Sequence, residues 1–159
     1  MDSSEIGDKT ELKFKEWLEK HRIPYLYINQ EKGTFSSVFE DQLKRPDFII
    51  LIENFGFILV DVKYKKISKE YGTYSIDYNE TKKFSSFQRK FNIPIWYAIS
   101  NEESDYKTWL WIPVSRVLEL NVEACISSKS NEPFFPISMD NFIQISHNES
   151  IEKLFIKSL

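Results

Sequence analysis

Two apolar runs separated by a short turn dominate the pattern of hydrophobic positions along the chain. They cover residues 48–52 and 57–60, and β-branched, aromatic and leucine residues fill both. The connecting residues 53–56 include an asparagine and a glycine, which supply the positive φ values that a tight connection needs. The pattern predicts a β-hairpin with strands at 47–53 and 57–63, each buried on both faces.

Apolar residues recur at helical spacing in two other segments, and a short apolar run follows each of them. The predicted elements are helices at 8–21 and 78–91 and strands at 25–28 and 95–100. We expect Asp8 or Thr10 to cap the first helix. Asp77 is expected to cap the second helix, with Glu80 as the reciprocal glutamate of a capping box.

The pattern after residue 100 is weaker and contains no internal repeat. It favours strands at 108–113, 134–137 and 142–145, and helices at 114–120 and 150–157. Helices and strands therefore alternate along a chain of 159 residues, a length that fits one domain. We predict an α/β fold, a mixed β-sheet flanked by helices, as a single domain over residues 1–159.

Composition narrows the classes of function. The chain is 42% hydrophobic and 28% charged, with a net charge of −3, so any nucleic-acid surface must be a local basic patch. The single cysteine excludes an intramolecular disulfide and fits a reducing compartment. The acidic N-terminus lacks the apolar core of a signal peptide, and no apolar run approaches membrane-spanning length. We expect a cytoplasmic protein with no membrane partner.

Charged residues flank the apolar hairpin at its open end. Asp47 opens the first strand, and Asp61 and Lys63 close the second. Because the strands are antiparallel, Asp47 and Asp61 are expected to converge, and the alternation of strand side chains places Asp61 and Lys63 on one face. Charged groups are rarely buried unless they are paired or bind a metal. The cluster is therefore either a salt-bridged cap or a Mg²⁺ (or Mn²⁺) site with a lysine beside it.

The sequences Pro46-Asp47 and Asp61-Val62-Lys63, on the strands of one hairpin, resemble the motif of the PD-(D/E)XK nucleases, the restriction-endonuclease-like superfamily. The compact spacing is similar to that of the smaller members, which resemble archaeal Holliday-junction resolvases. The order helix, three strands, helix, strand over about residues 7–100 also resembles the family core, which leaves 101–159 as a C-terminal elaboration. The resemblance implies a restriction-endonuclease-like fold and a metal-dependent phosphodiesterase.

The resemblance also implies roles for the residues at the hairpin rim. Asp47 and Asp61 would bind the metal ion. Lys63 would orient or deprotonate the attacking water, or stabilise the charge that develops on the phosphate.

Two further site residues follow from the resemblance. Many family members carry a glutamate on the first core helix, and Glu11 matches it as a third metal ligand; Glu5 and Glu16 are weaker candidates. Without the resemblance, interaction with the helix dipole is the simpler explanation of Glu11. In several families a polar residue on the second helix assists the reaction, and Gln88 is assigned this role with Lys82 as the alternative.

Basic residues gather around the predicted site despite the acidic total. The candidates for nucleic-acid contacts are Arg45, Lys65, Lys66, Lys69, Lys82 and Lys83. A solvated face is the alternative explanation of such a cluster, but here it follows the strand that carries Lys63, where a phosphate backbone would pass. Tyr71, Tyr74 and Tyr78 are interleaved with it and could stack on bases or pack locally.

The leading hypothesis is a Mg²⁺-dependent endonuclease that acts on DNA, including structured DNA, with RNA less favoured. A homodimer is the assembly that the resemblance suggests, because cutting two strands calls for two sites. One alternative is a catalytically inactive nuclease-like domain that binds nucleic acid or a protein partner, and another is a purely structural salt-bridge network. Metal dependence separates the first hypothesis from the others, and salt-dependent DNA binding separates the second from the third.

Overall fold

The computed structural model describes residues 2–31, 33–37, 39 and 43–156. A six-stranded mixed sheet forms its centre, with the strand order β1-β2-β3-β5-β6-β9. Its strands are β1 (Tyr25–Tyr27), β2 (Phe48–Ile52), β3 (Gly56–Tyr64), β5 (Ile95–Ser100), β6 (Thr108–Pro113) and β9 (Ile143–Ser146). Only β3 and β5 pair in parallel among these neighbours. A second sheet has the order β4-β8-β7, from β4 (Thr73–Asp77), β8 (Pro133–Ser138) and β7 (Cys125–Ile126).

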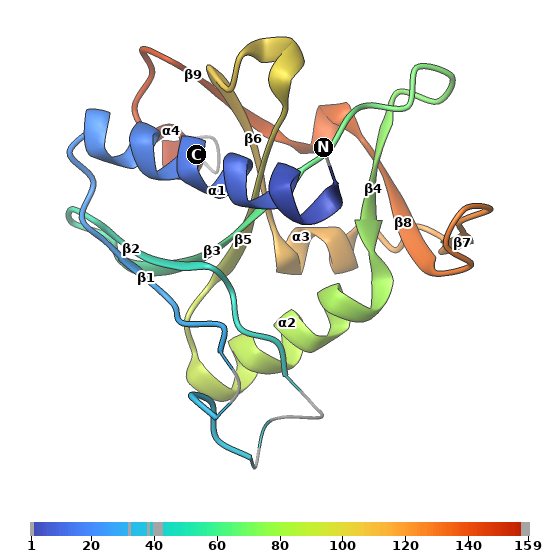
Figure 1. The fold of residues 1–159 in the computed structure, drawn as a ribbon, viewed down its shortest axis with the longest axis horizontal. Coiled ribbons are helices and arrows are strands. Elements are labelled where there is room, and N and C mark those ends of the chain that lie inside the picture. Colours follow the sequence, from blue (N-terminus) through green and yellow to red (C-terminus); the bar gives the residue numbers. More distant parts are fainter. Residues whose placement is uncertain (1, 32, 38, 40–42, 157–159) are drawn as a thin grey trace.

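Helices cover both faces of the central sheet (Figure 1). They are α1 (Ser3–Lys20), α2 (Tyr78–Phe91), α3 (Val114–Glu119) and α4 (Lys153–Ile156), with 3₁₀ turns η1 (Glu102–Ser104) and η2 (Met139–Asn141). One buried cluster joins α1 to one face of the sheet through Phe14, Trp17 and Leu18. A second cluster joins the other face to α2, α3 and the small sheet. The predicted α/β fold with a mixed sheet between helices is therefore confirmed.

The predicted hairpin is present as β2 and β3. Asn54 and Gly56 adopt φ values of 70° and 108°, so the turn needs the left-handed backbone that these residues tolerate. Burial on both faces holds for β3 over residues 58–62 but is wrong for β2, where Leu51 remains 38% exposed. The reason is position, because β2 lies near the sheet edge, beyond the part of the face that α2 covers.

The helix ends follow their capping residues. Helix α1 begins five residues earlier than expected because Asp2 and Glu5 form a capping box, with Glu5 N–H donating to Asp2 Oδ1 at 2.9 Å. The expectation that Asp8 or Thr10 caps this helix was wrong, since both lie inside it. Helix α2 has the predicted bounds, with Asp77 as its N-cap.

The C-terminal part of the chain completes the architecture. It adds β6 and β9 to the central sheet and supplies β7 and β8 to the small one. The sequence pattern did not predict β4 or β7, and the terminal helix covers only Lys153–Ile156 among the described residues. No helix in the described part of the chain is long and apolar enough to cross a membrane.

Candidate active site

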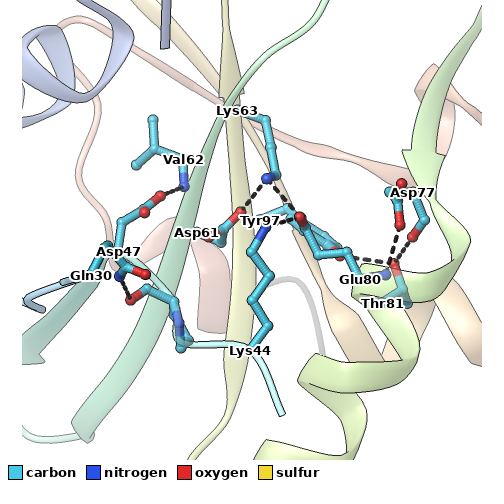
Figure 2. A network of polar contacts seen from close by, with 11 residues as sticks. Gln30, Lys44, Asp47, Asp61, Val62, Lys63, Asp77, Glu80, Thr81 and Tyr97 are labelled. Atoms are coloured by element: carbon cyan, nitrogen blue, oxygen red, sulfur yellow. Dashed lines mark hydrogen bonds and ion pairs between the residues drawn. The ribbon is translucent and has the colours of Figure 1, made fainter. Parts of the chain in front are cut away.

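Asp61 and Lys63 face the α2 side of the sheet, near the carboxyl end of β3. Asp61 is 2% exposed, and its Oδ2 lies 2.9 Å from Lys63 Nζ. The same Nζ lies 2.7 Å from Oε1 of Glu80, which comes from the first turn of α2 (Figure 2). Lys63 therefore bridges two carboxylates that reach it from different elements.

Asp47 is fastened to the same strand by its backbone and its side chain. Its N–H donates to Val60 O at 3.0 Å, although Phe48 is the residue opposite Val60 in the ladder. Asp47 and Phe48 thus both lie opposite Val60, and two residues opposite one is the geometry of a β-bulge. The Asp47 carboxylate then takes the place of a backbone acceptor, as Val62 N–H donates to its Oδ2 at 2.8 Å. This bond holds the carboxylate against β3, one residue from Asp61.

The positive charge near Asp47 and Asp61 is too small to offset the cost of burying both carboxylates in ionised form. Burial, then the charges of Asp61 and Glu11, raise the pKa of Asp47 to about 9. Burial likewise raises the pKa of Asp61, although Lys63 opposes the effect. Burial would lower the pKa of Lys63, but Asp61 and Glu80 outweigh it and hold this pKa above the ordinary lysine value. Lys63 is therefore a permanent cation, and the aspartates around it are poised to take up a proton or another cation.

Glu80 is the site residue that the sequence reasoning assigned to another role. Asp77 Oδ1 does accept from Glu80 N–H, at 2.6 Å, as a cap should. The Glu80 side chain turns instead to Lys63 and Lys44. Burial opposes its ionisation, but the two lysines outweigh burial and lower its pKa. The signal that could have found it is topology: α2 connects the parallel strands β3 and β5, so its first turn returns to the carboxyl end of β3.

The two other residues implied by the resemblance have different surroundings. Glu11 lies on α1 and accepts from the Tyr27 hydroxyl at 2.9 Å, near enough to Asp47 to raise the pKa of that carboxyl. Gln88 accepts from Ile95 N–H at 3.0 Å, so it joins the end of α2 to β5 and does not contact the cluster around Lys63. Within the described residues, no group of three His, Cys, Asp or Glu side chains is arranged to hold a metal ion.

The predicted basic residues are only partly brought to the site. Arg45 is used within the protein, because its guanidinium donates to the carbonyls of Asn29, Gln30 and Glu31 and lies over the Phe35 ring. Lys66 pairs with the exposed Glu102 at 2.8 Å, and Lys69, Lys82 and Lys83 are exposed. Lys65 is half-buried, and burial and then the nearby charge of Lys63 lower its pKa.

The fold is similar to that of known nucleases. A Holliday junction resolvase from the archaeal hyperthermophile Archaeoglobus fulgidus aligns over 88% of each chain, with 14% identity and a TM-score of 0.51. A bacterial homing endonuclease aligns over 94% of this chain and 79% of its own, with 14% identity and a TM-score of 0.46. A nuclease from a fusellovirus aligns over 92% and 83%, with 12% identity and a TM-score of 0.48. The likeness to the resolvase confirms the predicted restriction-endonuclease-like fold.

Comparisons of the sequence found no match. No protein family matches the chain, and neither does any curated protein sequence.

Proposed function

We propose that this protein is a metal-dependent phosphodiesterase that cleaves DNA, including structured DNA, at the cluster of Asp47, Asp61 and Lys63. One observation carries the proposal: a permanently charged lysine lies beside two buried aspartates whose pKa values are raised. A buried carboxylate without a cation is costly. A cluster that keeps two of them next to a lysine is better suited to chemistry than to stability.

The donors suit a divalent cation. Asp47 and Asp61 offer carboxylate oxygens, which Mg²⁺ and Mn²⁺ prefer, and a cation would supply the positive charge that the cluster lacks. Mg²⁺ uses one or two carboxylates and completes its shell with waters and substrate phosphate. We assign the metal to Asp47 and Asp61. Glu11 stays the third carboxylate that the resemblance implies, because its charge acts on Asp47, although the described residues present no preformed group of three donors. When bound, the ion would polarise the phosphate and acidify a water molecule.

The role of Lys63 follows from its charge. In phosphodiester hydrolysis a water oxygen forms a bond to phosphorus, one bridging P–O bond breaks, and a proton passes from the water to the solvent or a base while the leaving oxygen gains one. Asp61 and Glu80 keep Lys63 protonated, so it does not act as the base. It orients the water and offsets the negative charge that develops on the phosphate oxygens.

The test is an activity assay on the purified chain. Linear, nicked, single-stranded and branched DNA, and RNA, are each incubated with Mg²⁺, Mn²⁺ or EDTA. We expect cleavage of DNA with either metal and none with EDTA, because the aspartates alone cannot stabilise negative charge on a phosphate. If the wild-type chain cleaves none of these substrates, the phosphodiesterase proposal is wrong.

A second candidate is a nuclease-like domain that binds nucleic acid or a protein without cutting. Two observations favour it: Lys63 is already paired with Asp61 and Glu80, and the described residues contain no three-donor metal group. This candidate predicts salt-dependent DNA binding that divalent metal leaves unchanged. A protein of the first kind should cleave only with the metal present.

Glu80 is proposed as a positioning residue that acts through Lys63. Glu80→Gln keeps the shape but removes the charge, so Lys63 loses one of its two ion pairs. We expect cleavage to fall by up to about 100-fold, which is the effect of misplacing a catalytic group. Added Mn²⁺ should not rescue this variant, because its defect is not in metal binding.

The matched control is Glu119→Gln, since Glu119 is an exposed helix glutamate 4.0 Å from Arg116. It should cleave like the wild type. Equal cleavage rates for Glu80→Gln and Glu119→Gln would show that Glu80 does not position Lys63 for the reaction.

A further inference from the structure

A groove of about 1290 Å³ runs over the outer face of the small sheet. Its floor consists of side chains that alternate with the buried ones on β4 and β8, namely Thr73, Ser75, Asp77, Phe134 and Pro136. The rest of its lining comes from the loop between β3 and β4 and from the hairpin loop between β7 and β8. Small-molecule sites usually enclose about 300–1,000 Å³. The size and open shape of this groove therefore suit a segment of polymer.

Two residues of the groove lining neighbour the candidate active site. Lys65 lines the groove and stands two residues beyond Lys63 on the same chain segment. Asp77 also lines it, and this residue caps the helix turn that carries Glu80. A polymer lying in the groove would therefore contact Lys65, whose amine is close enough to feel the charges of Lys63 and Glu80.

The chemistry of the lining distinguishes between duplex and single strand. Lys65 and Lys129 face three carboxylates, those of Glu70, Asp77 and Glu132, so the groove cannot neutralise a run of phosphates. Contacts along a phosphate backbone depend on such neutralisation in a duplex and in a single strand alike, so this lining favours a segment held through its bases, which a duplex does not expose. The groove instead offers hydroxyl groups that can donate to phosphate or base atoms, from Ser68, Thr73, Ser75, Ser127, Ser128 and Ser130.

Aromatic side chains complete the lining. Tyr71 is 72% exposed at the rim, and Phe134 is half-buried in the floor. Unpaired bases stack on such rings, whereas the bases of a duplex are already stacked on each other. An exposed tyrosine at a hydroxyl-lined groove thus favours a strand with free bases.

We propose that this groove binds a single-stranded segment of the nucleic-acid substrate, with Tyr71 stacking on a base and Lys65 contacting the phosphate nearest the site of cleavage. The inference rests on the proposed function, since it takes Asp61 and Lys63 as the point of cleavage. It adds a substrate class: a duplex or branch with a single-stranded extension.

The experiment measures binding without cleavage. The full chain is titrated in EDTA against a labelled single strand, a blunt duplex, and the same duplex with a single-stranded extension, and fluorescence anisotropy is recorded. We expect the extension to tighten binding, and Tyr71→Ala to weaken it by about 5- to 100-fold, the effect of losing one base–aromatic stack. Tyr71→Phe should bind like the wild type. Phe57→Ala is the matched control, as Phe57 is 56% exposed and outside the groove.

The outcomes separate this inference from the proposed function. Equal binding of the blunt and extended duplexes, or equal binding by Tyr71→Ala and wild type, would overturn the groove assignment even if the chain cleaves DNA. Such a result would leave the groove to another class of partner, such as a peptide. Tyr71-dependent binding of the extension, by a chain that cleaves nothing with Mg²⁺ or Mn²⁺, would support the groove and refute the phosphodiesterase chemistry.

Discussion

Asp61→Asn and Lys63→Ala should each reduce metal-dependent cleavage by at least about 100- to 1,000-fold, the effect of removing one group that stabilises the transition state. The reasons differ. Asparagine keeps the shape of Asp61 but removes the charge that attracts the cation. Alanine at position 63 leaves both aspartates in place but removes the cation that faces the phosphate. The measurement is the single-turnover cleavage rate with Mg²⁺ and with Mn²⁺.

The two variants should also respond differently to metal. Mn²⁺ binds oxygen ligands more tightly than Mg²⁺ in most sites, so it should restore part of the activity of Asp61→Asn. It should not restore Lys63→Ala, whose defect is the missing cation. Circular dichroism should show folded proteins, because neither change opens a large cavity. Lys63→Ala should unfold at a lower temperature than the wild type, since it leaves Asp61 and Glu80 without their cation.

The chain provides its own control for this experiment. Asp105 and Lys107 repeat the Asp-x-Lys spacing, with side chains that are 81% and 61% exposed and 3.8 Å apart. Asp105→Asn and Lys107→Ala should cleave at the wild-type rate. If Asp61→Asn and Lys63→Ala match these controls, cleavage comes from another site or from a contaminating nuclease.

The contrast between the two Asp-x-Lys sequences shows what the sequence could predict. The spacing alone is equal in both, and only the apolar hairpin around Asp61 marked that copy as buried. The hairpin turn, helix α2 and strand β5 were predictable because local signals set each of them. The turn has Asn54 and Gly56 with positive φ, the helix has Asp77 as its N-cap, and the strand is a continuous apolar run.

Features that depend on distant contacts were not predictable in this way. Strand β4 exists because it pairs with β8, about sixty residues further along the chain. The bulge at Asp47 depends on which carbonyl its N–H meets on β3. Glu80 looked like a capping residue because the local signal for a cap was complete, while its lysine partners come from a loop and a strand. Local propensity carries no information about such partners.

Asp47 makes the metal-free protein less stable as the pH rises. Its pKa is about 9 in the folded chain, against 3.8 as the ordinary value. The folded state therefore keeps a proton that the unfolded state loses, and stability falls with rising pH between these values. Asp61 acts in the same direction. From about pH 5 to about pH 9 the part of the loss due to Asp47 alone should be at most about 5 kcal/mol, at about 1.36 kcal/mol for each pH unit.

Glu80 and Lys63, the other two titratable groups of the cluster, change the free energy of unfolding mainly outside this pH range. The lowered pKa of Glu80 adds stability as the pH rises through the ordinary glutamate range, which lies below about pH 5. The raised pKa of Lys63 matters only at or above the ordinary lysine pKa of about 10.4. Within the cluster, denaturant unfolding between about pH 5 and about pH 9 therefore reports mainly on the two aspartates. Outside it, burial and then the charge of Lys20 lower the pKa of His147, which adds stability only as the pH rises to the ordinary histidine value of 6.5.

A divalent cation should reverse the loss, because it replaces the proton on Asp47. We expect Mn²⁺ or Mg²⁺ to raise the free energy of unfolding at about pH 9, and to raise it little at about pH 5 where the proton competes. Calorimetry in buffers of different ionisation enthalpy should show protons released on binding. Asp47→Asn should reduce the pH dependence to the part that Asp61 contributes and should abolish the metal effect, since asparagine can still accept from Val62 N–H but neither ionises nor attracts a cation. Asp105→Asn, on an exposed side chain, should leave both unchanged. A wild-type stability that stays level across this range, with no response to metal at about pH 9, would mean that Asp47 is an ordinary structural carboxylate and that the metal assignment is wrong.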